Sequence, residues 1–100
     1  MKTSYIGGQW RPGSDGYRNI NPSDTSDVVD EFSQADESLA LEAIDAAYQA
    51  FTTGQVLGVQ ARADALDRVG TELLARKEEL GELLSREEGK TRAEGIGEVA

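Results

Sequence analysis

The sequence predicts an α+β fold, with an N-terminal β-hairpin or short strands followed by three to four amphipathic helices. The first observation is that short apolar runs alternate with Gly, Pro, Asn and Asp over residues 4–34, which is typical of strands joined by turns. The second is that apolar residues from residue 36 onward recur every three or four positions, the period of a helix. We therefore expect strands over about 4–34 and helices over about 36–100, within one small domain of 100 residues.

Turn residues indicate how the strand region is connected. The runs "SYIGGQW" and "YRNI" flank the turn-rich segment "RPGSDG" at 11–16, so we expect a hairpin across that segment. Asn21-Pro22 then interrupts the chain, because the residue before proline avoids helical geometry. The apolar residues of 28–32 indicate a third strand.

The first two helices are marked by a cap and by their apolar faces. Asp36 is a good N-cap for the first helix, which we expect to end at Gly54. Its apolar face contains Ala40, Ile44, Ala47, Tyr48 and Phe51. A second helix begins at about Gln60, and its apolar face contains Ala61, Ala65, Leu66, Val69 and Leu73.

A third helix follows from about Lys77, with Leu80, Leu83 and Leu84 directed inward, and Gly89 ends it. The periodicity leaves open whether the second and third helices are separate or form one bent rod. A fourth helical pattern, Ala93, Ile96, Val99 and Ala100, starts but reaches no capping signal. We therefore expect the sequence to be the front of a longer protein.

Composition disfavours several classes of function. The chain has 19 acidic and 10 basic residues, a net charge of -9, so nucleic acid and anionic membranes are not expected partners. It contains no Cys and no His, which argues against a thiolate nucleophile, a metal site or histidine acid–base chemistry. The start has no apolar signal peptide, and no apolar run approaches a membrane span. We expect a cytoplasmic protein.

The segment "REEGKTRAEGIGEVA" contains two outlines of nucleotide motifs. A phosphate loop requires a glycine five positions before Gly89, and Leu84 stands there. The preceding residues are also helical and charged, where the motif requires a buried strand. Gly89 is therefore read as a helix C-cap in a left-handed turn.

The second outline is G-x-G-x-x-A at Gly95, Gly97 and Ala100. A dinucleotide fingerprint needs a strand before it and a helix after it, and "KTRAE" is no buried strand. The simpler interpretation is a glycine-containing helix that packs closely against a neighbour.

Other candidate groups also favour structural roles. The adjacent acids Glu78-Glu79 and Glu87-Glu88 fit solvated helix faces better than buried acid–base pairs. The aromatic residues Trp10, Tyr17 and Phe51 fit packing in a core or a domain seam better than stacking on a ligand. We assign no catalytic, cofactor-binding or metal-binding residue within 1–100.

The order of short motifs along the chain is more specific than any one of them. In sequence order these motifs are Ile6-Gly7-Gly8-Gln9-Trp10, Asn19-Ile20-Asn21-Pro22, Ala35-Asp36, Ala47-Tyr48-Gln49-Ala50-Phe51, Arg62, Leu73-Leu74, Glu88-Gly89-Lys90, Ala93-Glu94 and Glu98-Val99. This order resembles the N-terminal segment of the aldehyde dehydrogenase superfamily over essentially the whole chain. The details are most similar to the α-ketoglutaric semialdehyde (2,5-dioxopentanoate) dehydrogenase branch. One departure is "TTGQVLGVQ", where family members often carry a tryptophan.

The resemblance implies a fold and an activity for the parent protein. It implies that 1–100 is the N-terminal part of the cofactor-binding domain of an α/β enzyme, with the remainder of the enzyme absent. Such enzymes use NAD or NADP to oxidise an aldehyde to an acid through a cysteine nucleophile and a glutamate-activated water. Their catalytic and dinucleotide-binding residues lie beyond this segment, so none is transferred to a position here.

The resemblance also implies partners for the fragment. We expect it to pack against the remainder of its own catalytic chain in a homo-oligomer, to bind no cofactor and to be inactive alone. Helix faces left uncovered would make the isolated chain self-associate or be marginally stable, which sedimentation would test. Two alternatives stay open: a stand-alone helical protein-interaction domain, and a small nucleotide binder that uses the Gly-rich tail.

Overall fold

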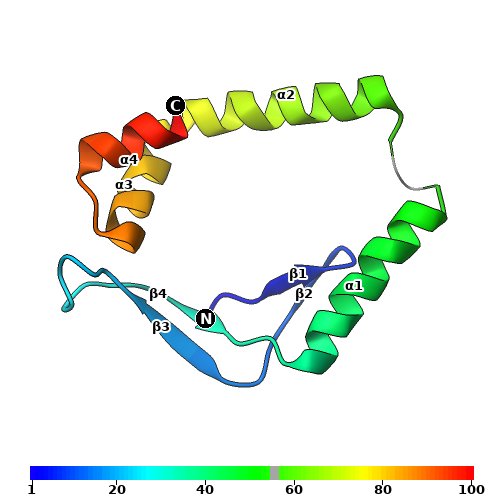
Figure 1. Cartoon of the computed structure of the whole chain (residues 1–100), viewed down its shortest axis with the longest axis horizontal. Coiled ribbons are helices and arrows are strands. Elements are labelled where there is room, and N and C mark those ends of the chain that lie inside the picture. Colours follow the sequence, from blue (N-terminus) through cyan, green and yellow to red (C-terminus); the bar gives the residue numbers. More distant parts are fainter. Residues whose placement is uncertain (55–56) are drawn as a thin grey trace. The chain divides into compact units, whose positions relative to one another are not determined.

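The structure, a computed structural model, describes residues 1–54 and 57–100 and confirms the predicted fold class (Figure 1). Short strands come first: β1 (Ser4–Ile6), β2 (Gln9–Arg11), β3 (Gly16–Ile20) and β4 (Val28–Ser33). Helices follow: α1 (Glu37–Thr52), α2 (Val59–Ala75), α3 (Lys77–Glu88) and α4 (Arg92–Val99). Gln55 and Val56, within the segment that departs from the family pattern, lie outside the described residues.

The chain forms two compact units. One consists of Met1–Arg18 and Asp30–Leu57, and the other of Asn19–Val29 and Gly58–Ala100. The loop between β3 and β4 therefore belongs to the same unit as the last three helices.

The N-terminal hairpin has a different turn from the one predicted. β1 and β2 pair antiparallel with Tyr5 opposite Trp10, and the turn is Gly7-Gly8, with φ angles of 58° and 82°. Two successive positive φ angles suit the primed turns that match strand twist, and glycine adopts them without strain. The hairpin predicted across 11–16 is wrong, because β3 pairs with β4 and not with β2.

The segment at 11–16 instead connects the two sheets. The Ser14 amide donates to the Gln34 carbonyl at 3.0 Å, and the Gln34 amide donates to the Asp15 carbonyl at 2.5 Å. Through these bonds the Ser14 amide and the Asp15 carbonyl pair with Gln34, so these backbone groups have partners although the segment forms no hairpin turn. The parallel bridge between Lys2 and Phe32 further ties the N-terminus to β4.

Helix α1 begins at the predicted cap but turns an unexpected face toward the hairpin. The Asp36 carboxylate accepts a hydrogen bond from the Leu39 amide at 2.8 Å. Leu39 is 7% exposed, and among the described residues it is the one buried hydrophobic residue. Four alanines of α1 line a groove beside β1, namely Ala43, Ala46, Ala47 and Ala50, and only Ala47 of these belongs to the face predicted from the sequence. The predicted apolar face is exposed at Ile44, Tyr48 and Phe51.

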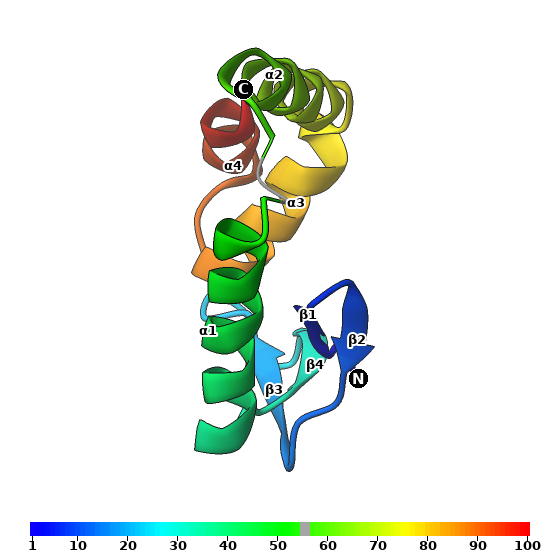
Figure 2. The ribbon, with the colours of Figure 1, turned by 90° about the vertical axis from the view of Figure 1, so that its right-hand side faces the viewer.

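Helices α2 and α3 are separate, which answers the question that periodicity left open. Arg76 lies between them with φ -106° and ψ 19°, outside helical geometry. Helices α3 and α4 lie side by side (Figure 2). Glycines make that approach possible, because a Cβ on Gly81 would lie 2.5 Å from the Ile96 Cα. Of the predicted inward residues of α3, Leu80 and Leu84 are half-buried and Leu83 is exposed.

Candidate functional site

The glycine of "GKT" ends a helix, as predicted. Gly89 follows α3 in the left-handed conformation at φ 75°, and its amide donates to the Ser85 carbonyl at 2.8 Å. The Ser23 hydroxyl donates to the Gly89 carbonyl at 2.5 Å. A Cβ at this glycine would lie 2.7 Å from Pro22 Cγ. Both the left-handed φ and this close approach therefore require glycine.

The lysine of "GKT" is already paired with carboxylates. The Lys90 Nζ lies 2.7 Å from a Glu88 oxygen and also contacts the Glu98 carboxylate. Hydrogen bonds that the ammonium donates to these two carboxylates, Glu88 first, raise the pKa of Lys90 above its usual value. With 19% of its side chain exposed, this ammonium is neutralised locally rather than presented to a phosphate.

The threonine of "GKT" caps the following helix. The Glu94 amide donates to the Thr91 hydroxyl at 3.2 Å, and the Thr91 amide donates to the Glu94 carboxylate at 3.1 Å. This reciprocal capping box places a carboxylate at the start of α4, where an anionic ligand would otherwise bind. The bond from the Thr91 backbone lowers the pKa of Glu94. The three residues of "GKT" thus have structural partners, and no phosphate cradle forms.

The glycines of G-x-G-x-x-A lie within α4 and not in a loop after a strand. Gly95 is buried, and a Cβ there would collide with the Gly81 carbonyl oxygen. Gly97 faces open space. The outline is therefore a helix-packing pattern, as predicted, and it does not fit a dinucleotide.

A polar cluster that the sequence interpretation missed joins the β3–β4 loop to the end of α3. Arg86 donates to both carboxylate oxygens of Asp27, at 2.9 and 2.7 Å. Asn21 donates to the same carboxylate at 3.2 Å, and Asn19 donates to Glu87 at 2.6 Å. The bonds from Arg86, and then Asn21, lower the pKa of Asp27 to about 2.

Every member of this cluster is paired with another protein group. Among the buried side-chain atoms of the described residues, none lacks a hydrogen-bond partner. The cluster therefore has the chemistry of a structural clamp. Composition gives no signal for it, because its two halves lie 59 positions apart in the sequence.

The remaining candidate residues form no reactive constellation. Glu79 pairs with Arg76 at 2.7 Å and Glu78 with Arg92 at 3.2 Å, on exposed helix surfaces. Trp10 packs against Tyr5 with ring centroids 5.0 Å apart, and both side chains are exposed. Tyr17 stacks on Phe32 at 5.7 Å, while Phe51 is 71% exposed. Within residues 1–54 and 57–100, no group of acids is arranged to hold a metal ion.

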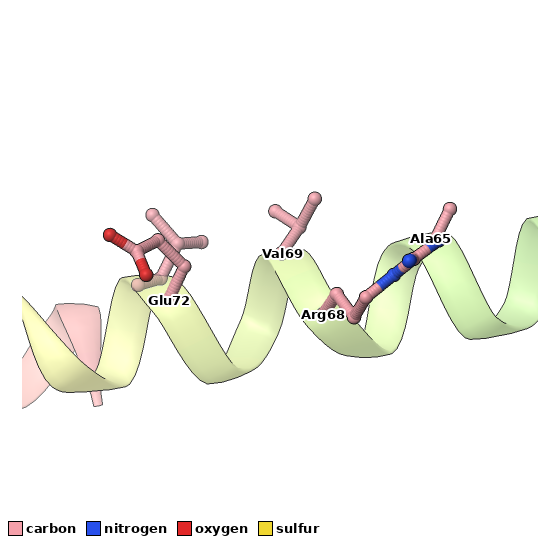
Figure 3. A pocket seen from close by; sticks show the side chains of 5 residues that line it. Ala65, Arg68, Val69 and Glu72 are labelled. Carbon is pink, nitrogen blue, oxygen red and sulfur yellow. The ribbon is translucent and has the colours of Figure 1, made fainter.

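One apolar surface lies along helix α2. On α2, Ala65, Val69 and Leu73 form one stripe, with Arg68 and Glu72 beside it (Figure 3). Leu66 adjoins this stripe and is 71% exposed. All the residues that line this surface come from α2, so it is an open helix face and not an enclosed site. It offers hydrophobic area for packing and no group for catalysis.

None of the described helices combines the length and apolarity needed to cross a bilayer. The geometry thus shows capped helices, one polar clamp and uncovered apolar faces. These features suit a supporting segment that packs against other structure.

Comparison with known proteins agrees with this picture. Residues 10–100 match the sequence model of the aldehyde dehydrogenase family. An α-ketoglutarate semialdehyde dehydrogenase from Haloferax volcanii is 37% identical over 98 residues, covering 96% of this chain and 20% of that protein. A mitochondrial succinate-semialdehyde dehydrogenase from Arabidopsis thaliana is 36% identical over 99 residues, covering 95% of this chain and 18% of that protein.

A solved structure shares the fold. Betaine aldehyde dehydrogenase from Staphylococcus aureus, in complex with NAD+, superimposes with a TM-score of 0.92 over 99% of this chain and 20% of that one, at 24% identity. The chain spans about a fifth of the length of the relatives it matches.

Proposed function

The chain belongs to the aldehyde dehydrogenase family, and from that premise we propose that residues 1–100 form the N-terminal part of its cofactor-binding domain. In this role the segment is a structural support. Its helices pack around the outside of the domain, and the groups that bind the dinucleotide and the aldehyde come from the remainder of the polypeptide.

The observation that carries this proposal is the near absence of a core of its own. Among the described residues, Leu39 is the only buried hydrophobic residue. A domain that folds alone usually contains one contiguous core of several such residues. Helix α1 is apolar both toward the hairpin, at Ala43, and on its exposed side, at Ile44. A helix with apolar residues on two faces is typically covered by other structure on both of them.

The activity we propose for the complete protein is the oxidation of an aldehyde to a carboxylic acid with NAD or NADP. The nicotinamide, when bound, accepts a hydride from the substrate. These 100 residues contain no cysteine, so a cysteine nucleophile must come from elsewhere in the polypeptide. The residues of "GKT" and "GIGEVA" do not fit a dinucleotide, and we propose that the segment alone is inactive.

For the substrate we propose α-ketoglutarate semialdehyde. The support is the Haloferax volcanii relative of that name, at 37% identity. A succinate-semialdehyde dehydrogenase is similar at 36%, so succinate semialdehyde is the competing substrate. Both compounds are short aldehydes that carry a carboxylate, and the choice between them would be made by residues outside this segment.

We extend the proposal to a cytoplasmic homo-oligomer. The support for assembly is the membership of the chain in this family, for which we expect homo-oligomers. The net charge of -9 is consistent with the cytoplasm. Size-exclusion chromatography with light scattering on the native protein tests the assembly, and a monomer would contradict it.

The experiment that tests the function uses the complete protein as its source produces it. Formation of NADH or NADPH is followed by absorbance with α-ketoglutarate semialdehyde, succinate semialdehyde and betaine aldehyde, each with NAD and with NADP. We expect oxidation of the semialdehydes, with the highest kcat/KM for α-ketoglutarate semialdehyde. A preference for succinate semialdehyde would overturn only the proposed substrate. If no aldehyde were oxidised, the proposed enzymatic activity would be wrong and a protein-interaction domain would be favoured.

A matched control separates the role of the segment from that of the enzyme. The 100-residue chain, assayed at the same molar concentration, should give no cofactor reduction. Oxidation by the isolated chain would contradict the supporting role proposed here, even with the family assignment intact.

A further inference from the structure

We draw no further inference here: the strongest candidate, the exposed stripe of Leu41, Ile44, Tyr48 and Phe51 along α1, is an unpartnered apolar face, and nothing in the structure shows what covers it.

Discussion

Arg86, near the end of α3, holds the carboxylate of Asp27 through two nitrogen–oxygen contacts of 2.9 and 2.7 Å. Paired bonds of this kind between a guanidinium and a carboxylate are directional and stronger than neutral hydrogen bonds. They fix the loop between β3 and β4 against the helix end. Ser23 and Gly89 add a second point of attachment close by.

The clamp makes the loop sensitive to acid. The pKa of Asp27 falls from an ordinary value of 3.8 to about 2, because Arg86 and then Asn21 bind its charged form. A carboxyl whose pKa is lowered by folding stabilises the folded state above its unfolded pKa. That stabilisation is lost as the pH falls from about 4 through about 2. The protection of the amides within 21–27 against hydrogen exchange, measured relative to an unstructured chain at the same pH, should fall over that window.

The Arg86→Gln substitution should raise the pKa of Asp27 toward its ordinary value and accelerate exchange in the loop at neutral pH. Arg76→Gln is the matched control, since it removes an exposed pair with Glu79 in the same unit. Equal exchange in the loop of both variants and the unaltered protein would show that the clamp does not hold it.

Gly89 should be harder to replace than a glycine with the same backbone angle elsewhere. Gly54 also has φ 75°, but a Cβ there would meet no atom of the described residues within 4 Å. Gly54→Ala should therefore cost only the left-handed conformation, about 1–2 kcal/mol. Gly89→Ala should cost more, because its Cβ also meets Pro22. Denaturant unfolding of the native protein measures both values, and equal losses would refute the close approach.

Two glycines of α4 should respond in opposite directions to alanine. Gly95→Ala places a methyl group against the Gly81 carbonyl, and overpacking of this kind costs about 1–3 kcal/mol. Gly97→Ala meets open space and should stabilise the helix by up to about 1 kcal/mol. Thermal unfolding distinguishes these outcomes. Similar changes in both variants would argue against the packing role of Gly95.

Leu66, which adjoins the α2 stripe, allows a test of whether other structure covers this face of the helix. Leu66 is 71% exposed, so Leu66→Ala should change the stability of the isolated chain little. If the remainder of the enzyme covers it, the same change in the complete protein should cost about 2–5 kcal/mol. Thr71→Ala, on the opposite side of α2, serves as the control. A small effect of Leu66→Ala in the complete protein would mean that this face stays open.

Local signals in the sequence identified the helices well. Asp36 and Gly89 are signals that a single residue provides. The Asp36 side chain accepts a hydrogen bond from an amide of the first helical turn, and the Gly89 backbone adopts a positive φ. The start of the third helix at about Lys77 was predicted, but a break before it was left open, because Arg76 is neither a glycine nor a proline and lies between two helical patterns.

Pairing and packing were harder to predict, because they depend on partners distant in sequence. The hairpin was placed at 11–16 by turn composition, whereas the two glycines at 7–8 offer a shorter turn of the right twist. Of the face predicted for α1, only Ala47 lies beside the hairpin, together with Ala43, Ala46 and Ala50, which the prediction did not include. Arg86 and Asp27 have no local signature, so their pairing emerges only in the structure.

The structural interpretation of "GKT" and "GIGEVA" could be made from the sequence. Leu84 stands where a phosphate loop needs glycine, and "KTRAE" stands where a dinucleotide fingerprint needs a buried strand. The structure adds the physical reason, since Gly89, Lys90 and Thr91 are committed to a helix end, an ion pair and a capping box.

The central claim is that this chain is the supporting N-terminal segment of a much larger enzyme, and the most direct test is the intact mass of the protein purified from its source. The account predicts a single polypeptide of about five times the 10.8 kDa of this chain, because the chain spans about a fifth of its relatives. A native polypeptide of 10.8 kDa would contradict it, because no catalytic cysteine would then exist in the molecule.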